Sequence, residues 1–250
     1  MGFMYRFIKR IFDIVTALAG LIFLSPVLTL IILAIWLQDF KSPFYISERV
    51  GKNEKTFRII KLRSMIVGAD KKGVDSTSVN DSRITTVGKI VRKYKLDELS
   101  QLFNVIKGDM SLVGPRPNVK RETDIYTVEE KKLLTIKPGI TDFASIVFAD
   151  EGEILENRSN PDIAYNQLIR PGKSRLGLFY IEHQSLVLDL KIILLTIVAI
   201  LSRDSSLRKT VNLLEKIGAN NELLILAARK HALVPTPPPG ANKIVTSRFE

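Results

Sequence analysis

Two adjacent carboxylates, Asp97 and Glu98, are the side chains whose types and spacing could do chemistry. Helical spacing runs over residues 88–106, with a predicted buried stripe of Leu99, Leu102, Phe103 and Ile106. Neighbouring side chains on a helix point about 100° apart, so at most one of the two carboxylates can lie on that stripe. A carboxylate can act as a nucleophile or as a general acid or base, although such a pair more often belongs to a solvated helix face.

Three basic side chains have the chemistry needed to bind phosphate. Arg116 lies between Pro115 and Pro117, whose fixed φ angles stiffen the backbone on both sides. An arginine held in this way suits bidentate phosphate binding, although an incidental surface arginine is commoner. Lys61 and Arg63 alternate along a predicted strand and would share one face, for which an ordinary solvated basic edge is the competing interpretation.

Composition excludes several classes of site. The 250 residues include no cysteine, which rules out disulfides, thiolate metal ligands and a cysteine nucleophile. Only His183 and His231 could supply imidazole, so a zinc enzyme or a serine-histidine triad is disfavoured. The net charge of +11 favours negatively charged partners, namely nucleic acid, anionic lipid or phosphorylated small molecules.

The element that dominates the N-terminal part is an uncharged apolar run at residues 14–37. As a helix it would extend about 36 Å, which exceeds the hydrocarbon core of about 30 Å, so we predict that it lies in a membrane. A cleaved signal peptide is disfavoured because the small residues 17–19 precede most of the run.

Ser25 and Pro26 interrupt this run near its middle, and the proline predicts a kink or a break. Each half is too short to span a membrane alone, which permits a re-entrant hairpin that returns to its entry side. A kinked spanning helix is the alternative. Positive charges flank both ends of the run, so the positive-inside rule permits both ends to be cytoplasmic; they are Arg6, Lys9, Arg10, Lys41, Arg49 and Lys52.

The remaining chain predicts a small hairpin followed mainly by helices, which is an α+β, mostly helical fold. Strands are expected at residues 44–49 and 56–61 around a turn at 51–53, and a polar loop at 70–82. Residues 137–141 predict a tight turn, 185–202 an interfacial or core helix, 212–231 an amphipathic helix, and residues from 235 an extended, mobile tail. The predicted organisation is a membrane helix at 1–40, a domain at 41–205 and a C-terminal helix and tail at 206–250.

Six motifs, taken in order, resemble the monotopic phosphoglycosyl transferases among the bacterial sugar transferases. The resemblance covers residues 6–201 and is to the minimal form, of the type that transfers N,N'-diacetylbacillosamine 1-phosphate to undecaprenyl phosphate. Each motif is weak alone, but six in order with similar spacing are specific. They are Lys9-Arg10-Ile11-Phe12-Asp13, Ser25-Pro26, Lys61-Leu62-Arg63-Ser64-Met65, Leu96-Asp97-Glu98-Leu99, Gly108-Asp109-Met110-Ser111-Leu112-Val113-Gly114-Pro115-Arg116-Pro117 and Pro138-Gly139-Ile140-Thr141.

The resemblance implies a membrane enzyme. It implies a re-entrant helix broken at Ser25-Pro26 and a domain on the cytoplasmic face of the bacterial inner membrane. It also implies a Mg²⁺-dependent transfer of sugar 1-phosphate from a UDP-sugar to polyprenyl phosphate, with release of UMP. By resemblance, Asp97 is the nucleophile, forms the covalent sugar-phosphate intermediate and lies near the metal, and Glu98 handles a proton or positions Asp97.

The phosphate contacts that we expect, given this resemblance, come from four cations, since phosphoryl transfer depends on positive charge around the reacting group. They are Lys61, Arg63, Arg92 and Arg116. Two departures from the family pattern follow. Residues 142–150 replace a stretch that carries an arginine in many relatives, which leaves the donor sugar open, and Leu99-Ser100 replaces a leucine-proline pair.

Two other classes of function compete with this hypothesis. A non-catalytic basic membrane adaptor that binds anionic lipid or a partner enzyme explains the charge and the apolar helices equally well. It does not explain the order of the motifs around Asp97, Glu98 and Arg116. A membrane-tethered nucleic-acid binder predicts a groove-reading or base-stacking motif, and the sequence has none, so we expect no nucleic-acid partner.

Overall fold

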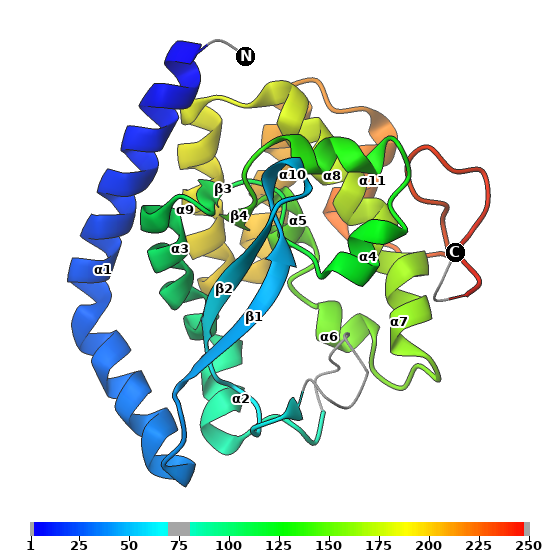
Figure 1. The fold of residues 1–250 in the computed structure, drawn as a ribbon. Helices are drawn as coiled ribbons and strands as arrows, with labels where there is room; N and C mark the ends of the chain where they lie inside the picture. Colours follow the sequence, from blue (N-terminus) through cyan, green and yellow to red (C-terminus); the bar gives the residue numbers. More distant parts are fainter. Residues whose placement is uncertain (1–2, 70–80, 248–250) are drawn as a thin grey trace.

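The computed structural model describes residues 3–69 and 81–247. Most of the predicted polar loop at 70–82 lies outside these residues. The long N-terminal helix α1 (Phe3–Asp39) runs along one side of the molecule and bends near its middle (Figure 1). Among the described residues it is the one helix long and apolar enough to cross a membrane, with a mean hydropathy of 2.7 over its most apolar part.

Pro26 does not divide α1 into two separate helices, because Ser25 compensates for the missing backbone donor. A proline at position 26 leaves the carbonyl of Ile22 without its usual partner. The Ser25 hydroxyl donates a hydrogen bond of 2.8 Å to that carbonyl, and the Thr29 hydroxyl donates one of 2.8 Å to the carbonyl of Ser25. Of the kink or break expected at Pro26, the structure has the kink, within one continuous, bent helix.

The predicted hairpin is confirmed. Strand β1 (Phe44–Val50) pairs antiparallel with β2 (Thr56–Leu62), and the short η1 (Lys52–Glu54) forms the turn. Asn53 has a φ of 55°, a left-handed conformation that asparagine tolerates better than most residues. In the register of the pair, Lys61 lies opposite Tyr45 near the open end of the hairpin.

The helix predicted at residues 88–106 is in fact three shorter pieces: α2 (Thr86–Lys93), η3 (Leu96–Gln101) and α3 (Leu102–Lys107). Lys95 has a φ of 53°, and this left-handed residue resets the helical phase. The predicted apolar stripe is therefore only partly right. Leu102 is buried, whereas Phe103 is 47% exposed and the buried positions of α3 also include Asn104 and Val105.

A second sheet, which the sequence did not predict, joins two glycine-containing segments. Strand β3 (Ser111–Val113) pairs in parallel with β4 (Gly139–Thr141), where a tight turn was expected. The backbones approach so closely that a Cβ on Gly139 would lie 2.1 Å from the nitrogen of Gly114. This contact explains why glycine is needed in the Pro138-Gly139 segment.

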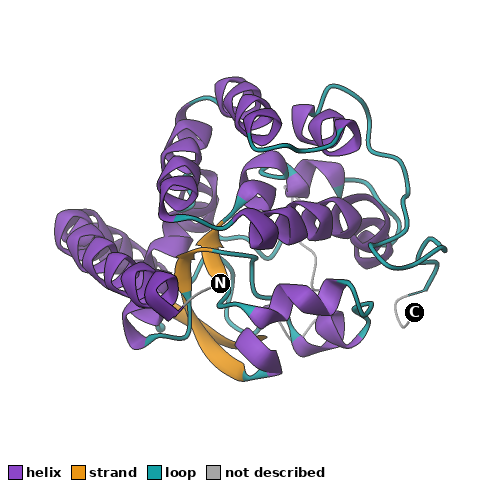
Figure 2. Ribbon diagram, turned by 90° about the horizontal axis from the view of Figure 1, so that it is seen from above, coloured by secondary structure: helices purple, strands orange, loops and turns teal. Residues whose placement is uncertain are grey.

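The other elements are mostly helical, and the strands lie between α1 and most of these helices (Figure 2). One core joins them, with fully buried side chains such as Phe143, Leu176 and Ile192 at its centre. The elements are α4 (Lys120–Asp124), η4 (Glu130–Thr135), α5 (Phe143–Val147), α6 (Glu151–Ile154), α7 (Pro161–Ala164), the π-helical η5 (Tyr165–Ile169), α8 (Arg170–His183), α9 (Leu186–Leu201), α10 (Arg203–Lys216) and α11 (Asn221–Ala228).

Helix α9 forms where the sequence predicted an interfacial or core helix, and one of its faces packs in the core. Leu188 and Ile192 are buried, while Val187, Leu194 and Leu201 are exposed on the other side. The single helix predicted at 212–231 is wrong, because α10 and α11 are separated by a turn at Gly218, whose φ is 87°.

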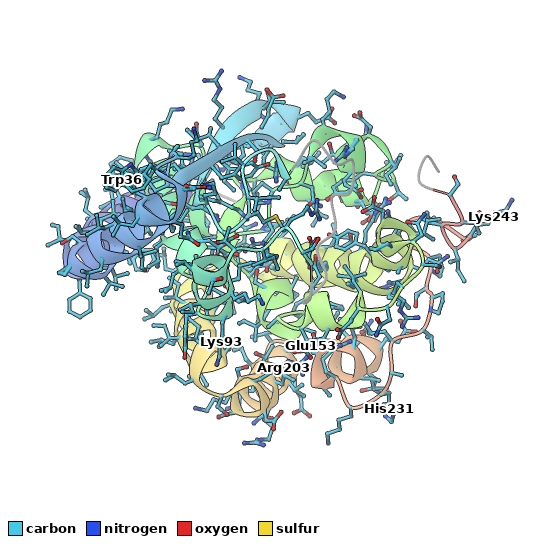
Figure 3. All side chains as sticks on the ribbon, turned by 90° about the horizontal axis from the view of Figure 1, so that it is seen from below. Trp36, Lys93, Glu153, Arg203, His231 and Lys243 are labelled. Carbon is cyan, nitrogen blue, oxygen red and sulfur yellow. The ribbon has the colours of Figure 1, made fainter. Side chains whose placement is uncertain are left out.

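The C-terminal segment is extended, as predicted, but it packs against the domain. The carbonyl of Pro237 accepts a hydrogen bond from Arg175, and the carbonyl of Val245 accepts one from Gln167. In Figure 3, Lys243 of this segment and Trp36 of α1 lie at opposite sides of the molecule.

Both ends of α1 are attached to the same domain. Near its start, Lys9 pairs with the buried Asp189 of α9 at 2.5 Å, and Arg10 donates to the carbonyls of Val105 and Ile106 at 2.5 and 2.8 Å. At its end, Asp39 forms a bidentate ion pair with Arg63, with both distances 2.6 Å. The helix is therefore fixed at two points far apart along its length.

Candidate active site

The strand β2 and the following helices position Asp97 and Glu98. The Ser100 hydroxyl on η3 donates 3.0 Å to the carbonyl of Ile60, which ties η3 to the end of β2. The side chain of Asn104 on α3 accepts a hydrogen bond from the Ile60 nitrogen and donates one to the Arg58 carbonyl. These contacts fix the backbone that carries both carboxylates against a regular strand.

Glu98 is held by Arg116 in a bidentate ion pair. The two Nη atoms of Arg116 lie 2.8 Å from the two carboxylate oxygens of Glu98, and one Nη also donates 3.1 Å to the carbonyl of Ile140. Burial by itself would raise the pKa of Glu98, but the charge of Arg116 and its hydrogen bonds outweigh burial and lower the pKa to about 2. Glu98 is therefore ionised and immobilised near neutral pH.

Asp97 is in a different environment from its neighbour. Its carboxylate forms no hydrogen bond or ion pair with any part of the chain that the structure describes, and the residue is only partly buried. Burial, and then the adjacent charge of Glu98, raise the pKa of Asp97 above its usual range, while Lys61, Arg92 and Arg116 oppose that rise. The Asp97 carboxylate therefore has no bonding partner among the described residues and lies in the field of several cations.

Three cations predicted from the sequence are brought together with the two carboxylates, and two more were missed. Lys61, Arg92 and Arg116 all act electrostatically on Asp97. The pKa of Lys61 is lowered, first by burial and then by Arg116, so this lysine lies among like charges. The missed residues are Arg49 and Lys95. The charge of Arg49 contributes to lowering the pKa of Lys61, and the charge of Lys95 contributes to lowering the pKa of Glu98.

Arg63 is not part of this group. Its guanidinium binds Asp39 through two nitrogens, and its Nε donates 2.8 Å to the carbonyl of Ser42. The alternation of Lys61 and Arg63 along the strand therefore does not give them a shared function. In the structure Arg63 fastens the end of α1, and its guanidinium uses three of its five N–H donors for Asp39 and Ser42.

The segment 142–150, which departs from the family pattern, is mainly core. Residues 143–148 are all buried, and five of them form α5. Asp142 caps this helix by accepting hydrogen bonds from the nitrogen and hydroxyl of Ser145 at 2.7 and 2.6 Å. The carbonyl of Ser145 accepts a hydrogen bond of 3.1 Å from Lys95, which links the segment to the candidate site.

At the end of the segment, Asp150 pairs with two arginines from the C-terminal part, Arg203 at 2.7 Å and Arg229 at 2.8 Å. These pairs connect the start of α10 and the end of α11 to Asp150, the last residue of segment 142–150. The acidic residue at position 150 therefore has a structural partner, which the sequence alone did not reveal.

Asp97 and Glu98 together supply few side-chain ligands for a metal ion. Within residues 3–69 and 81–247 there is no cluster of three acidic, histidine or cysteine side chains that could hold a metal ion. Glu98 gives both oxygens to Arg116, whereas both oxygens of Asp97 are free. Mg²⁺ commonly binds one or two carboxylates and completes its shell with substrate phosphates and water, and the free Asp97 carboxylate fits that arrangement.

Comparison with known proteins gives one consistent result. The sequence profile of the family described as "Bacterial sugar transferase" matches residues 4–203. The chain is 34% identical over 201 residues to the UDP-N-acetylgalactosamine-undecaprenyl-phosphate N-acetylgalactosaminephosphotransferase of Aeromonas hydrophila, covering 79% of this chain and 44% of the relative. It is 32% identical over 216 residues to the UDP-galactose-lipid carrier transferase of Erwinia amylovora, covering 80% of this chain and 42% of the relative.

A third relative is of similar length to this chain. The exopolysaccharide production protein ExoY of Sinorhizobium fredii is 33% identical over 213 residues, covering 79% of this chain and 87% of the relative. The chain thus spans less than half of the Aeromonas and Erwinia proteins. The matched region contains α1, both sheets and the Asp97-Glu98 pair.

Proposed function

The chain belongs to the bacterial sugar transferase family, and from that premise we propose that it transfers a sugar 1-phosphate from a UDP-sugar to a polyprenyl phosphate. The names of the Aeromonas and Erwinia relatives indicate nucleotide-sugar donors and lipid carriers as acceptors. The observation that carries the proposal for this chain is the contrast between the two adjacent carboxylates. Glu98 is locked to Arg116, and Asp97 is free beside Lys61 and Arg92.

This contrast favours a two-step displacement at one carboxylate. In the first step an oxygen of Asp97 attacks the phosphorus bonded to the sugar, the bond between that phosphorus and the UMP oxygen breaks, and UMP leaves. In the second step an oxygen of the polyprenyl phosphate attacks the same phosphorus, and the bond to Asp97 breaks. A covalent intermediate divides a hard transfer between a soluble donor and a lipid acceptor into two easier displacements.

The surrounding cations are suited to both displacements. Lys61, Arg92 and Arg116 lie close enough to act on the Asp97 charge, and Lys95 acts on Glu98. Positive charge that is already in place stabilises the charge that develops on phosphate oxygens in the transition state. Because Arg116 gives its fork to Glu98, its contribution is to hold Glu98 and add charge, rather than to chelate a phosphate as its sequence context suggested.

Mg²⁺ is part of the proposal. Asp97 would contribute a carboxylate oxygen to it, and the diphosphate of the donor would contribute others. When bound, the ion would neutralise charge on the diphosphate and ease departure of UMP. The free Asp97 carboxylate supports this assignment, and the occupied Glu98 carboxylate argues against a role for Glu98 as a ligand in this conformation.

The attachments of α1 support a re-entrant position in the membrane. Lys9 and Arg10 bind the domain near the start of the helix, and Asp39 binds it at the end. Because one domain holds both ends of α1, a helix that enters the membrane must leave it again on the side where it entered. Ile22 and Phe23, beside the bend, are 75% and 83% exposed, as expected for side chains that contact lipid.

The proposed location is the cytoplasmic face of the bacterial inner membrane, where a UDP-sugar is available. Trp36 packs edge-on against Phe40, with ring centroids 5.1 Å apart, at the end of α1. Aromatic side chains concentrate at the membrane-water interface, which suits this end of the helix. The exposed leucines of α9 provide a second apolar surface on the domain.

The experiment that tests the function is release of UMP from a panel of UDP-sugars by the purified protein in detergent, with Mg²⁺ and polyprenyl phosphate. We expect one or a few donors to give UMP together with a lipid-linked sugar phosphate, and we expect chelation of Mg²⁺ to stop both. A basic membrane adaptor would release no UMP from any donor.

A further inference from the structure

A cavity of about 310 Å³ lies apart from Asp97 and Glu98, between the start of α1 and the domain. Its walls come from the first turns of α1, from β3, from residues 135–137 and from the end of α8. This volume is in the range of sites that bury small ligands, about 300–1,000 Å³. None of Lys61, Arg92, Asp97, Glu98 and Arg116 lines it.

The cavity carries an excess of positive charge. Arg6, Lys52 and Lys137 line it, and within the described part of the chain none of the three has an ion-pair or hydrogen-bond partner for its side chain. Lys9 and Arg10 line it too, but they are engaged by Asp189 and by backbone carbonyls. Arg6 is exposed and Lys52 and Lys137 are partly buried, so three cations at the cavity remain available to an anion.

Among these cations, Lys137 gives the strongest indication that the cavity binds an anion. Burial, and then the nearby guanidinium of Arg10, lower the pKa of Lys137. A Cβ on Gly108 would lie 3.3 Å from Nη2 of Arg10 and 3.7 Å from Nζ of Lys137. The two positive charges are therefore close together beside Gly108. Among the described residues, Asp13 is the one carboxylate that lines the cavity, and it already interacts with Lys9 and with the nitrogen of Leu112.

Two buried hydroxyl groups in the lining have no partner in the described residues. Ser111 is 1% exposed, and its Oγ is buried without a hydrogen bond. The hydroxyl of Tyr5 is likewise buried and unpaired. Buried hydroxyls are almost always hydrogen-bonded, so these two point to a polar ligand that brings acceptor oxygens. A phosphate group has acceptors for both hydroxyls and charge for the lysines.

We propose that this cavity binds the phosphate of an anionic membrane phospholipid. The phosphate would come from a membrane lipid because of the surface of α1 beside the cavity. On the first turns of α1, the residues between the lining positions are apolar and exposed, including Phe7, Ile8 and Ile11. A phosphate in the cavity therefore lies next to the surface where α1 would contact lipid. The lipid would fasten the start of α1 to the domain, a role separate from the transfer reaction.

Free inorganic phosphate and the polyprenyl phosphate acceptor carry the same chemical group. The acceptor phosphate must reach Asp97, which the cavity lining does not include, so the proposal is for a phosphate diester that is not consumed. Native mass spectrometry of the detergent-purified full chain distinguishes the sources. The probes are phosphatidylglycerol, phosphatidylcholine, polyprenyl phosphate and inorganic phosphate, each added alone.

We expect the wild-type chain to retain phosphatidylglycerol in preference to phosphatidylcholine. The pair of changes Lys137→Gln and Ser111→Ala removes one charge and one hydroxyl, and occupancy should fall about tenfold, as for loss of a charge-assisted hydrogen bond. Arg6→Gln, at an exposed position that does not endanger the fold, should lower occupancy in the same direction. The matched control is Lys107→Gln, since Lys107 has a 67% exposed side chain outside the cavity, and it should leave occupancy unchanged.

Equal retention of phosphatidylcholine, an equal loss in Lys107→Gln, or unchanged occupancy in Arg6→Gln would each overturn the proposal. Binding of inorganic phosphate or polyprenyl phosphate without phosphatidylglycerol would overturn the lipid source. The readout is a bound mass rather than turnover, so it is independent of whether the proposed transfer reaction is correct. An inactive protein that keeps its lipid would therefore refute the function and leave this site intact.

Discussion

Both carboxylate oxygens of Glu98 lie 2.8 Å from the two Nη atoms of Arg116. The pair connects η3 to the rigid segment between Pro115 and Pro117, and its side chains are 17% and 26% exposed. A partly buried bidentate pair of this kind fixes the plane of the carboxylate as well as its charge. It leaves the adjacent Asp97 as the free acidic group in the cluster of cations.

The first prediction concerns this pair. Arg116→Lys keeps the charge but cannot reach both oxygens of Glu98, so Glu98 should lose its fixed orientation. We expect UMP release to fall by about 10- to 100-fold, which corresponds to loss of a charge-assisted hydrogen bond. Thermal unfolding of the same samples checks that the variant remains folded.

Coupling between the two residues can be measured directly. If they act as a unit, the combination Glu98→Gln with Arg116→Lys should be little worse than the more damaging single change. Losses that simply multiply would mean that the two residues act separately. Wild-type turnover in Arg116→Lys would reduce Arg116 to a residue without functional importance.

Lys61 and Arg63 should differ, although the sequence suggested the same role for both. Lys61→Gln removes a charge that acts on Asp97, so turnover should fall by about tenfold or more with little change in stability. Arg63→Gln releases Asp39 at the end of α1, so it should lower the unfolding temperature and change turnover per folded molecule by less than about threefold. The reverse pattern would show that the phosphate contact belongs to Arg63.

The parallel pair of β3 and β4 predicts a sensitive glycine. In Gly139→Ala the new Cβ would lie 2.1 Å from the nitrogen of Gly114, so the strands must separate, at a cost of about 1–3 kcal/mol. A lower unfolding temperature by several degrees is expected in detergent. Gly20→Ala is the control, since its Cβ would meet only a methyl group of Leu102 at 3.4 Å. Equal effects of the two changes would contradict the close packing of these strands.

The topology of α1 can be tested because the chain has no cysteine of its own. Met4 and Lys41 are exposed near the two ends of the helix, and single cysteines there should react with an impermeant thiol reagent from one side only. The expected result is labelling of both positions when the cytoplasmic face is accessible, and of neither from the opposite face. Labelling from opposite sides would mean that α1 spans the membrane.

Local signals in the sequence were sufficient for the hairpin and for the presence of helix α9. Alternation around a glycine turn predicts β1 and β2, and the register follows from the length of the turn. The break at Lys95 could not be predicted, because one left-handed residue leaves no periodic trace. The strands β3 and β4 have three residues each, which is too short for alternation to be read.

Long-range partners were the main limit for the candidate site. The residue types of Asp97, Glu98 and Arg116 were recognised from motifs, but nothing in the motifs says that Arg116 binds Glu98. In the same way, Arg63 and Asp39 are 24 positions apart, and only the path of α1 brings them together. Residue type and order therefore pointed to Asp97, Glu98 and Arg116, but they wrongly grouped Arg63 with Lys61 and missed Arg49 and Lys95, because these assignments depend on side-chain pairings that only the structure supplies.

The most direct test of the account is the intact mass of the protein after mixing with the active UDP-sugar and Mg²⁺ in the absence of polyprenyl phosphate. Wild-type protein should gain the mass of one sugar phosphate, release UMP, and yield a modified peptide that contains Asp97. Asp97→Asn should show neither the adduct nor UMP, whereas Glu98→Gln, slowed by roughly 100-fold, should still label slowly. An adduct on another residue, or on Asp97→Asn, would contradict the assignment of the nucleophile, and UMP release only after acceptor is added would contradict the covalent mechanism.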